Sequence, residues 1–277
     1  MPTLYVSDLD GTLLRSDQRT SDYTNRVINA LVEKGLRFSY ATARSANTAR
    51  KVTAGMTAAF PVIVYNGAFI RDNQSGEILL QNFFTAAEAL PLAQKLLRAG
   101  VRPVVYGFVD GEEKFSYLAD EINPGTREFV ESRRGDPRDR PVKTVDELLR
   151  GELFYFACID APEILEPFYA EYRDAFHCVY QKDIYSGEQW LELMPQAASK
   201  ANAIRQLAIR LGCDKIVVFG DGVNDLDMFA LADEAYAVAN AMPELKKAAT
   251  AVIGGNDEDG VAKWLEKEWS LESGEWS

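Results

Sequence analysis

The chain is poor in residues that several common enzyme chemistries need. It has one histidine, His177, in 277 residues, which gives weak support to Ser-His-Asp catalysis. Its three cysteines, Cys158, Cys178 and Cys213, lack the close spacing of a zinc site or a redox pair. We therefore expect reduced thiols in a reducing, cytoplasmic compartment. A Cys158–Cys178 disulfide between neighbouring strands is the alternative.

Long apolar runs and an excess of positive charge are also missing. No segment reaches the roughly 18 apolar residues that a bilayer span needs, and no signal-peptide pattern is visible. The formal net charge is -12, which argues against broad binding to nucleic acids or anionic membranes. A small anionic substrate is still compatible, because a bound cation and a few basic side chains can reverse the local field. We expect no nucleic-acid or membrane partner, and a monomer or weak homodimer.

Strand-like and helix-like segments alternate at both ends of the chain. This alternation begins with "TLYVS" and returns after Pro195, and it is typical of parallel βαβ units. The middle of the chain instead contains hairpin signals and paired strand-like runs with a few helices. The sequence therefore predicts an α/β core domain from residues 1–82 and 190–277, with an α+β domain inserted at residues 83–189.

Polar side chains follow four of the predicted core strands. Ligands of open parallel sheets bind at the carboxyl ends of the strands, so these side chains are candidates for one site. They are Asp8 and Asp10, Thr42 and Arg44, Asn66, and Asp221, Asn224 and Asp225. Repulsion and desolvation both oppose two carboxylates at the end of a buried strand. We therefore expect a metal cation beside the first pair.

Four short stretches of the sequence resemble, in this order, the four motifs of the haloacid dehalogenase-like superfamily. They are "DLDGT" at residues 8–12, "ATAR" at residues 41–44, Lys200 in "SKANAI", and "GDGVNDLDMF" at residues 220–229. Their spacing is similar to that of the Cof-type phosphatases, which carry a large α/β cap after the third strand. The resemblance covers essentially the whole chain. It implies a Rossmann-like parallel-sheet core and a cap domain that sets substrate specificity.

The resemblance also implies roles for the carboxylates. Asp8 resembles the nucleophile that forms an aspartyl-phosphate, and Asp10 resembles the general acid and base. A carboxylate can attack phosphorus, and oxygen ligands suit Mg²⁺. The implied Mg²⁺ ligands are Asp8, the backbone carbonyl of Asp10 and Asp221, with Asp225 acting through a bound water.

A second group of residues resembles the phosphate-binding donors of this superfamily. It consists of Thr42, Lys200 and Asn224, together with the backbone N–H groups of Leu9 and Ala43. A lysine at the start of a helix is electrostatically unfavourable, so Lys200 suggests a functional reason for its position.

Two residues and one departure from the family pattern have open interpretations. Arg44 could contact phosphate or pair with a nearby acid. Asn66 could lie near the active site or only form a turn with Gly67. Ala43 stands where the family often has glycine, and its methyl group is harmless only if its φ is negative. We expect that harmless case.

The expected activity is a Mg²⁺-dependent hydrolysis of small phosphorylated metabolites. Sugar phosphates are the first candidate class of substrate, and nucleotide or cofactor phosphates are further candidates. Asp10 favours this reaction, because dehalogenases of the superfamily lack an acid there and its ion-pumping ATPases carry Lys-Thr-Gly-Thr after the nucleophile. A hexose phosphomutase of the same superfamily is the alternative. A non-catalytic protein that binds phosphorylated metabolites is a weaker one.

Overall fold

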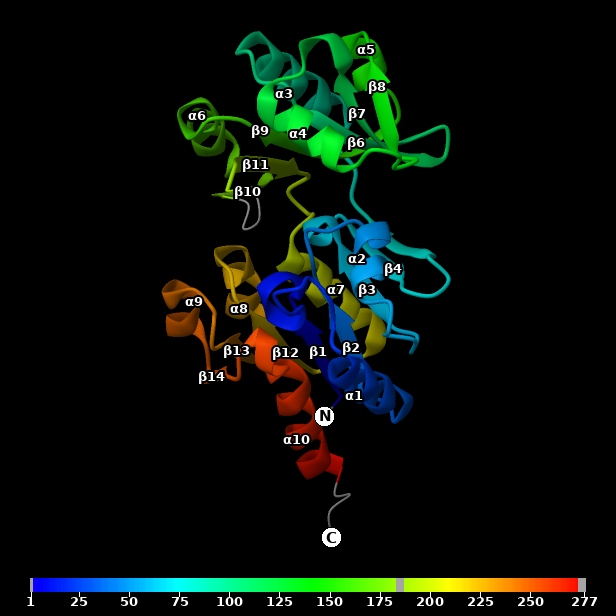
Figure 1. Ribbon diagram of the computed structural model, residues 1–277, viewed down its shortest axis with the longest axis vertical. Helices are drawn as coiled ribbons and strands as arrows, with labels where there is room; N and C mark the ends of the chain where they lie inside the picture. Colours follow the sequence, from blue (N-terminus) through cyan, green and yellow to red (C-terminus); the bar gives the residue numbers. More distant parts are fainter. Residues whose placement is uncertain (1, 183–186, 274–277) are drawn as a thin grey trace. The chain divides into compact units, whose positions relative to one another are not determined.

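The computed structural model describes residues 2–182 and 187–273. The chain divides into two compact units, one formed by Met1–Gln81 and Ser199–Ser277, the other by Asn82–Ala198. Figure 1 traces both units along the sequence. Each unit has its own sheet and its own apolar core, so each is described separately.

The first unit is built on a parallel sheet of five strands. In spatial order they are β14 (Ala251–Ile253), β13 (Glu234–Val238), β12 (Lys215–Gly220), β1 (Thr3–Ser7) and β2 (Arg37–Tyr40). Leu4, Tyr5 and Val6 of the central strand β1 are all buried, as expected for a strand that is covered on both faces. This parallel sheet confirms the α/β fold class predicted from the sequence.

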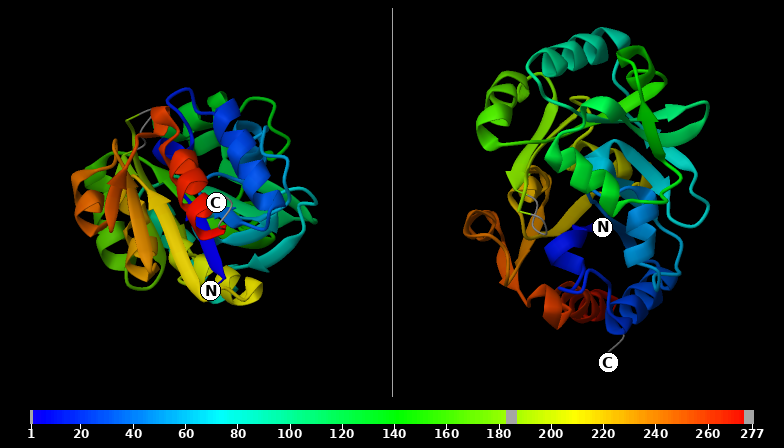
Figure 2. Two further views of the ribbon diagram at one scale, coloured as in Figure 1. Left: turned by 90° about the horizontal axis from the view of Figure 1, so that it is seen from below. Right: turned by 45° about the horizontal axis from the view of Figure 1, so that its top comes forward.

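Helices cover this sheet. They are α1 (Asp22–Glu33), α2 (Ala46–Val52), α7 (Lys200–Leu211), α8 (Leu226–Leu231), α9 (Pro243–Ala248) and α10 (Gly260–Ser273). Trp264 of α10 packs on Tyr5, Phe219 and Tyr236, with ring centroids 6.3, 5.1 and 4.4 Å apart. Helix α1 packs beside α10, and α7 packs beside α8. Figure 2 shows α7 and α10 on opposite sides of the sheet.

The third predicted strand does not extend the parallel sheet as a full ladder. Strands β3 (Pro61–Val64), β4 (Phe69–Asp72) and β5 (Ile78–Gln81) form a separate antiparallel sheet. A single parallel bridge between Ala41 and Ile63 connects β3 to the end of β2. Antiparallel pairing outweighs the βαβ pattern here, because β4 pairs with β3 and β5 pairs with β4.

The second unit contains a six-stranded mixed sheet. In spatial order its strands are β10 (His177–Lys182), β11 (Gln189–Met194), β9 (Glu152–Ile159), β6 (Val104–Val109), β7 (Glu112–Leu118) and β8 (Asp139–Val142). Only β7 and β8 pair in parallel among these. The helices of the unit are α3 (Ala86–Arg98), α4 (Pro124–Ser132), α5 (Val145–Leu148) and α6 (Pro162–Tyr172).

The core of the second unit lies between its sheet and helices α3 and α6. Leu92 and Leu96 of α3 and Leu165 of α6 belong to the same buried cluster as Phe156 and Leu191 of the sheet. A second set of rings packs around α4, where Phe129 contacts Phe115 and Trp190 with centroids 5.7 Å apart in both pairs. The rings of Phe115, Phe129 and Trp190 therefore pack within the second unit.

The predicted second boundary between the units, between residues 189 and 190, lies between residues 198 and 199 in the structure. Strand β11 (Gln189–Met194) pairs with both β10 and β9, so it belongs to the second unit, which ends at Ala198. Because β11 lies between them, Cys158 on β9 and Cys178 on β10 are not neighbours across a ladder, and both are free thiols. The disulfide alternative is therefore wrong.

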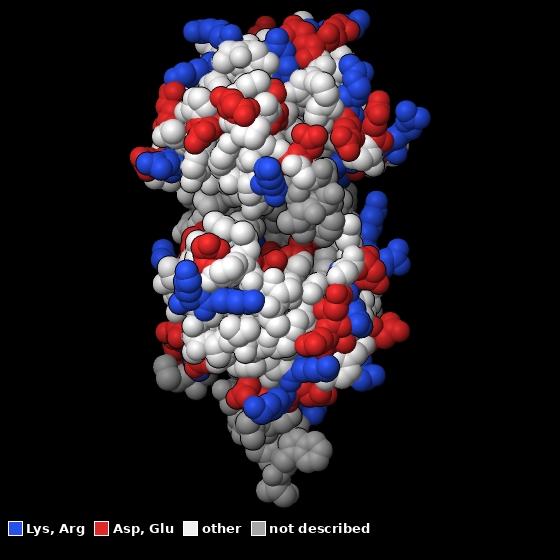
Figure 3. Space-filling view, turned by 60° about the vertical axis from the view of Figure 1, so that its left-hand side comes forward, with Lys and Arg blue, Asp and Glu red and all other residues white. Residues whose placement is uncertain are grey.

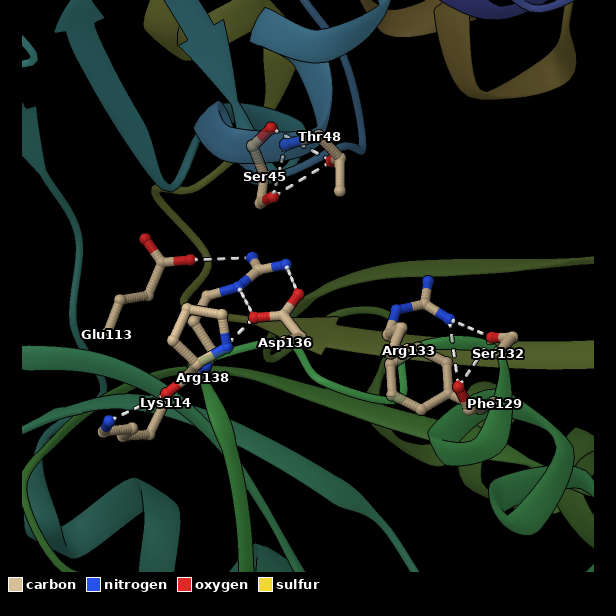
Figure 4. A network of polar contacts seen from close by, with 10 residues as sticks. Ser45, Thr48, Glu113, Lys114, Phe129, Ser132, Arg133, Asp136 and Arg138 are labelled. Atoms are coloured by element: carbon tan, nitrogen blue, oxygen red, sulfur yellow. Dashed lines mark hydrogen bonds and ion pairs between the residues drawn. The ribbon is translucent and has the colours of Figure 1, made fainter.

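A buried guanidinium organises the loop before β8. Arg138 is 5% exposed, and its Nη1 donates to Glu113 Oε1 at 3.0 Å. Its Nε and Nη2 donate to the two carboxylate oxygens of Asp136 at 2.9 and 2.6 Å. Figure 4 shows Arg138 between these carboxyl groups, and Arg133 over the ring of Phe129. The bidentate geometry is one that a planar guanidinium favours.

The surface carries both signs of charge. On the face shown in Figure 3, basic and acidic side chains are interspersed with uncharged surface. Within residues 2–182 and 187–273, no helix is both long enough and apolar enough to cross a bilayer.

Candidate active site

The first half of the candidate site is the turn that follows β1. The Asp8 N–H donates to Phe219 O at 2.9 Å, which aligns the ends of β1 and β12. The chain then enters a tight helical turn at Leu9–Leu13, where Gly11 has a φ of 78°. A Cβ on Gly11 would lie 2.3 Å from Asp221 Oδ2. Glycine therefore permits both this backbone conformation and the close approach of the two strand ends.

The second half is the turn Val223–Asp225, which follows β12. Asp225 is completely buried, and its Oδ2 accepts the N–H groups of Asp221 and Gly222, both at 3.1 Å. Thr12 Oγ1 donates to Asp221 Oδ1 at 2.9 Å. Thr12 was not singled out from the sequence, although it is the last residue of "DLDGT". Its hydroxyl connects the two turns directly.

Lys200 joins the carboxylates of both turns. It is the first residue of α7, and the hydroxyl of Ser199 before it caps the helix by accepting the Asn202 N–H at 3.1 Å. The Lys200 side chain is 1% exposed, and its Nζ lies 2.6 Å from Asp8 Oδ1 and 2.7 Å from Asp225 Oδ1. These two ion pairs explain why a lysine is tolerated at the positive end of a helix.

Three carboxylates of this site could hold a metal ion together. Asp8, Asp221 and Asp225 each offer an oxygen, and these oxygens all lie within 4.8 Å of one another. Three ionised carboxylates facing one Lys200 ammonium leave two negative charges uncompensated. An all-oxygen donor set with this excess charge fits a hard divalent cation such as Mg²⁺. The Asp10 side chain is not part of the group.

The electrostatics of the site show the same excess of negative charge. Burial raises the pKa of Asp8 well above its usual value; the Lys200 charge opposes this rise and the Asp225 charge adds to it. Burial and the Asp225 charge raise the pKa of Asp221 to about 7. Burial alone would lower the pKa of Lys200, but the Asp225 and Asp8 charges raise it above its usual value. Without a cation, the site therefore favours partial protonation of its carboxylates.

Asp10 pairs with Arg44. The guanidinium Nε donates to Asp10 Oδ2 at 2.8 Å and Nη2 donates to Asp10 Oδ1 at 2.6 Å. Of the two interpretations of Arg44 from the sequence, the structure therefore displays pairing with an acid. The same Nη2 lies 3.5 Å from Gln18 Oε1.

Thr42 follows the end of β2, and Asn66 lies in the turn Tyr65–Gly67, which follows β3. The Asn66 N–H donates to Thr42 O at 2.9 Å, and Thr42 Oγ1 accepts the Arg44 N–H at 3.1 Å. Asn66 is buried and has a φ of 51°. A Cβ on Gly67 would lie 2.2 Å from Ser199 O. The turn Tyr65–Gly67 is thus packed directly against the start of α7, which carries Lys200.

The resemblance predicts two backbone donors, the N–H groups of Leu9 and Ala43. Among the described residues, neither the Leu9 N–H nor the Ala43 N–H donates to an acceptor. Leu9 is fully buried, and an unpaired N–H in such a position is rare unless an anion or water completes it. Ala43 is not among the residues with positive φ, so its methyl group is not strained there. Asn224 lies in the turn Val223–Asp225 and is partly exposed.

Known proteins resemble this chain over nearly its whole length. A family model described as haloacid dehalogenase-like hydrolase matches residues 5–265. A 5-amino-6-(5-phospho-D-ribitylamino)uracil phosphatase of Bacillus subtilis is 26% identical, over 98% of this chain and 98% of the relative. A second phosphatase of the same name and organism is also 26% identical, over 94% of this chain and 96% of the relative.

Solved structures share the fold over nearly the whole chain. A Thermotoga maritima protein solved by X-ray crystallography superposes with a TM-score of 0.76 at 27% identity, covering 96% of this chain and 97% of that chain. A haloacid dehalogenase-like hydrolase of Bacteroides thetaiotaomicron gives a TM-score of 0.77 at 23% identity, over 97% of this chain and 100% of that chain. The second likeness, at this lower identity, bears on the fold alone.

Proposed function

Because this chain belongs to the haloacid dehalogenase-like hydrolases, a family with phosphatases among the chain's curated relatives, we propose that it is a Mg²⁺-dependent phosphatase of small phosphorylated metabolites. The observation that carries the proposal is the group of Asp8, Asp221 and Asp225 around the buried Lys200 ammonium. Phosphoryl transfer needs a nucleophilic carboxylate, oxygen ligands for a metal ion and a fixed positive charge. Here the fixed positive charge is the Lys200 ammonium.

The reaction begins with Asp8. One oxygen of Asp8 is held by Lys200, and the other attacks phosphorus in line with the leaving oxygen, so that an Asp8–phosphorus bond forms as the ester P–O bond breaks. Asp10 gives its proton to the leaving oxygen. It then takes a proton from the water that attacks phosphorus, which returns Asp8 and inorganic phosphate. A bound Mg²⁺ would neutralise charge on the phosphoryl oxygens.

The remaining residues position the phosphoryl group in this proposal. The N–H groups of Leu9 and Ala43, the Thr42 hydroxyl and the Asn224 amide donate hydrogen bonds to its oxygens. Preorganised donors of this kind stabilise the transition state more than the ground state. Asp225 supports the Mg²⁺ site. Its direct contact with Lys200 favours a role as a charge partner as well as a ligand through water.

The second unit, Asn82–Ala198, would set substrate specificity. We place sugar phosphates and related phosphorylated polyols first among candidate substrates, because two curated relatives are named for a phosphorylated ribityl compound. Nucleotide and cofactor phosphates form the next group to test.

The test is phosphate release from a panel of such metabolites, with Mg²⁺ and with EDTA. Wild type should release phosphate only with Mg²⁺, and Asp8→Asn should be inactive. Asp22→Asn is the matched control, because Asp22 is exposed in the first turn of α1 and its loss should leave the rate unchanged. Release by Asp8→Asn at the wild-type rate, or release that EDTA does not affect, would refute the proposal.

A further inference from the structure

Arg44 holds the side chain of Asp10 in one orientation. The proposed reaction uses this side chain for proton transfer. Each nitrogen of the fork engages a different carboxylate oxygen, at 2.8 and 2.6 Å. Two parallel hydrogen bonds restrain both side-chain torsions of an aspartate, which a single contact cannot do. Both side chains are largely shielded, with 19% and 23% of their surfaces exposed.

The backbone of Arg44 is itself held in place. Its N–H donates to Thr42 Oγ1 at 3.1 Å, and its carbonyl accepts the Tyr65 N–H at 3.0 Å. Helix α2 begins two residues later, with its cap at Ser45. The Arg44 guanidinium therefore extends from a backbone segment that is held in place beside the strand ends. Its two hydrogen bonds can for that reason fix the position of the Asp10 carboxyl group.

We propose that Arg44 is a positioning residue that orients the Asp10 carboxyl group for proton transfer, and that it does not bind the phosphoryl group. The inference rests on the proposed phosphatase function. Each Asp10 oxygen has lone pairs beyond the one that Arg44 uses, so the carboxyl group can still meet the leaving oxygen or the attacking water. The fork determines the direction in which those lone pairs point.

The two roles of Arg44 predict different dependence on the leaving group. A simple alkyl phosphate releases an alkoxide, which needs a proton from Asp10 as the bond breaks. 4-Nitrophenyl phosphate releases a stabilised anion, which needs no proton. Loss of Asp10 orientation should therefore slow the first substrate far more than the second, whereas loss of a phosphate contact should slow both equally.

The variant to test is Arg44→Lys, which keeps the charge and removes the fork. We expect kcat/KM for an alkyl phosphate to fall by about 10²-fold, the scale of a misplaced catalytic group. For 4-nitrophenyl phosphate we expect a loss of less than about 3-fold, since proton transfer supplies little there. The inhibition constant of inorganic phosphate should not change. Arg50→Lys is the matched control, because Arg50 on α2 donates to the Asn73 carbonyl at 3.1 Å and takes no part in the Arg44–Asp10 pair.

A second measurement needs no turnover. The denaturation midpoints of Asp10→Asn, Arg44→Lys and the double variant should be non-additive, because the two residues form one contact. Equal losses for both substrates, a weakened phosphate inhibition or additive midpoints would each overturn the inference. If wild type hydrolyses no phosphate ester, the proposed function fails, and the midpoints still decide whether the pair exists.

Discussion

Each unit of the chain contains a buried cation between two carboxylates, and the two clusters differ in how they are built. Arg138 in the second unit meets Asp136, two residues away, and Glu113. Lys200 in the first unit meets Asp8 and Asp225, which are 192 and 25 residues away in sequence. Glu113 is 25 residues from Arg138, so the Arg138 cluster lacks a contact as long in range as that between Lys200 and Asp8, and it fastens a loop. The Lys200 cluster exists only when three strand and helix ends converge.

The charge balance of the two clusters also differs. Asp221 adds a third carboxylate beside Lys200, and the pKa values of Asp8 and Asp221 are raised by burial and by the Asp225 charge. In the proposed function a divalent cation compensates this unfavourable charge, as suits an oxygen-only site. The comparison teaches that a buried ion pair alone does not mark a functional site, whereas uncompensated charge built from distant segments does.

The largest expected effect comes from replacing the two buried basic side chains, Lys200 and Arg138, one at a time. Lys200→Met leaves Asp8 and Asp225 buried and uncompensated, so we expect a loss of about 3–5 kcal/mol in the free energy of unfolding and a fall in kcat of at least about 10²-fold. Mg²⁺ should restore part of the stability. Arg138→Met should cost less, because the Asp136 and Glu113 side chains keep 15% and 13% exposure.

Chemical denaturation with and without Mg²⁺ checks this prediction. The Mg²⁺ response of Arg138→Met should equal that of wild type. An equal Mg²⁺ response in Lys200→Met and Arg138→Met would remove the distinction between the two clusters.

The next effect concerns the contact between the two strand ends. Gly11→Ala and Gly35→Ala both place an alanine at positive φ, 78° and 103°, and each should lose about 1 kcal/mol or more. Only at Gly11 would the new Cβ meet Asp221, since nothing lies within 4 Å at Gly35. We therefore expect Gly11→Ala alone to weaken Mg²⁺ binding, measured by calorimetric titration. Unaltered Mg²⁺ affinity in Gly11→Ala would place the metal away from Asp221.

A third effect is a pH dependence of stability in the metal-free protein. Because the pKa of Asp8 and that of Asp221 are raised in the folded state, the folded protein binds more protons than the unfolded chain. The two carboxyl groups contribute fully to the free energy of unfolding below the pKa of an aspartate in the unfolded chain, about 3.9. This contribution is lost as pH rises through about 7, the pKa of Asp221 in the folded protein. The increase in Tm caused by Mg²⁺ should therefore grow from pH 5 to pH 8. Asp221→Asn should flatten this trend and Arg138→Met should not.

The smallest effect is expected at Ala43. Because its φ is not positive, restoring the family's glycine should cost about 0.4–1 kcal/mol through the greater freedom of the unfolded chain. The kcat should stay within about 2-fold of wild type. A several-fold increase in kcat for Ala43→Gly would mean that the methyl group crowds the phosphate loop after all.

Much of the fold could be predicted from local patterns. The caps Ser21, Ser45 and Ser199 each accept a helix N–H in the structure, and side-chain capping is a local property. The errors involve pairing between segments. Strand β11 pairs with β10, the strand before it, but its ladder with β9 joins residues more than thirty apart, such as Trp190 and Ile159. Pro195 directly follows the end of β11, but the sequence does not show which sheet β11 joins.

For the site, convergence could be predicted and partners could not. Parallel strands bring their carboxyl ends to one edge, and the structure groups Asp8, Asp221 and Asp225 as that rule predicts. Which donor faces which acceptor depends on side-chain directions. The Lys200 contacts with Asp8 and Asp225, the Arg44 fork on Asp10 and the Thr12 bond to Asp221 therefore appeared only in three dimensions.

The most direct test of the central claim is to trap the phosphorylated enzyme. In Asp10→Asn, 4-nitrophenyl phosphate can still transfer its phosphoryl group, since its leaving anion needs no proton, while hydrolysis lacks its base. The reaction is run with Mg²⁺ and stopped with acid. Peptide mass spectrometry should then find one phosphoryl group on the peptide that contains Asp8. A phosphoryl group on another residue, or release of one equivalent of nitrophenol with no phosphoryl group on the enzyme, would contradict the assignment of Asp8 as the nucleophile.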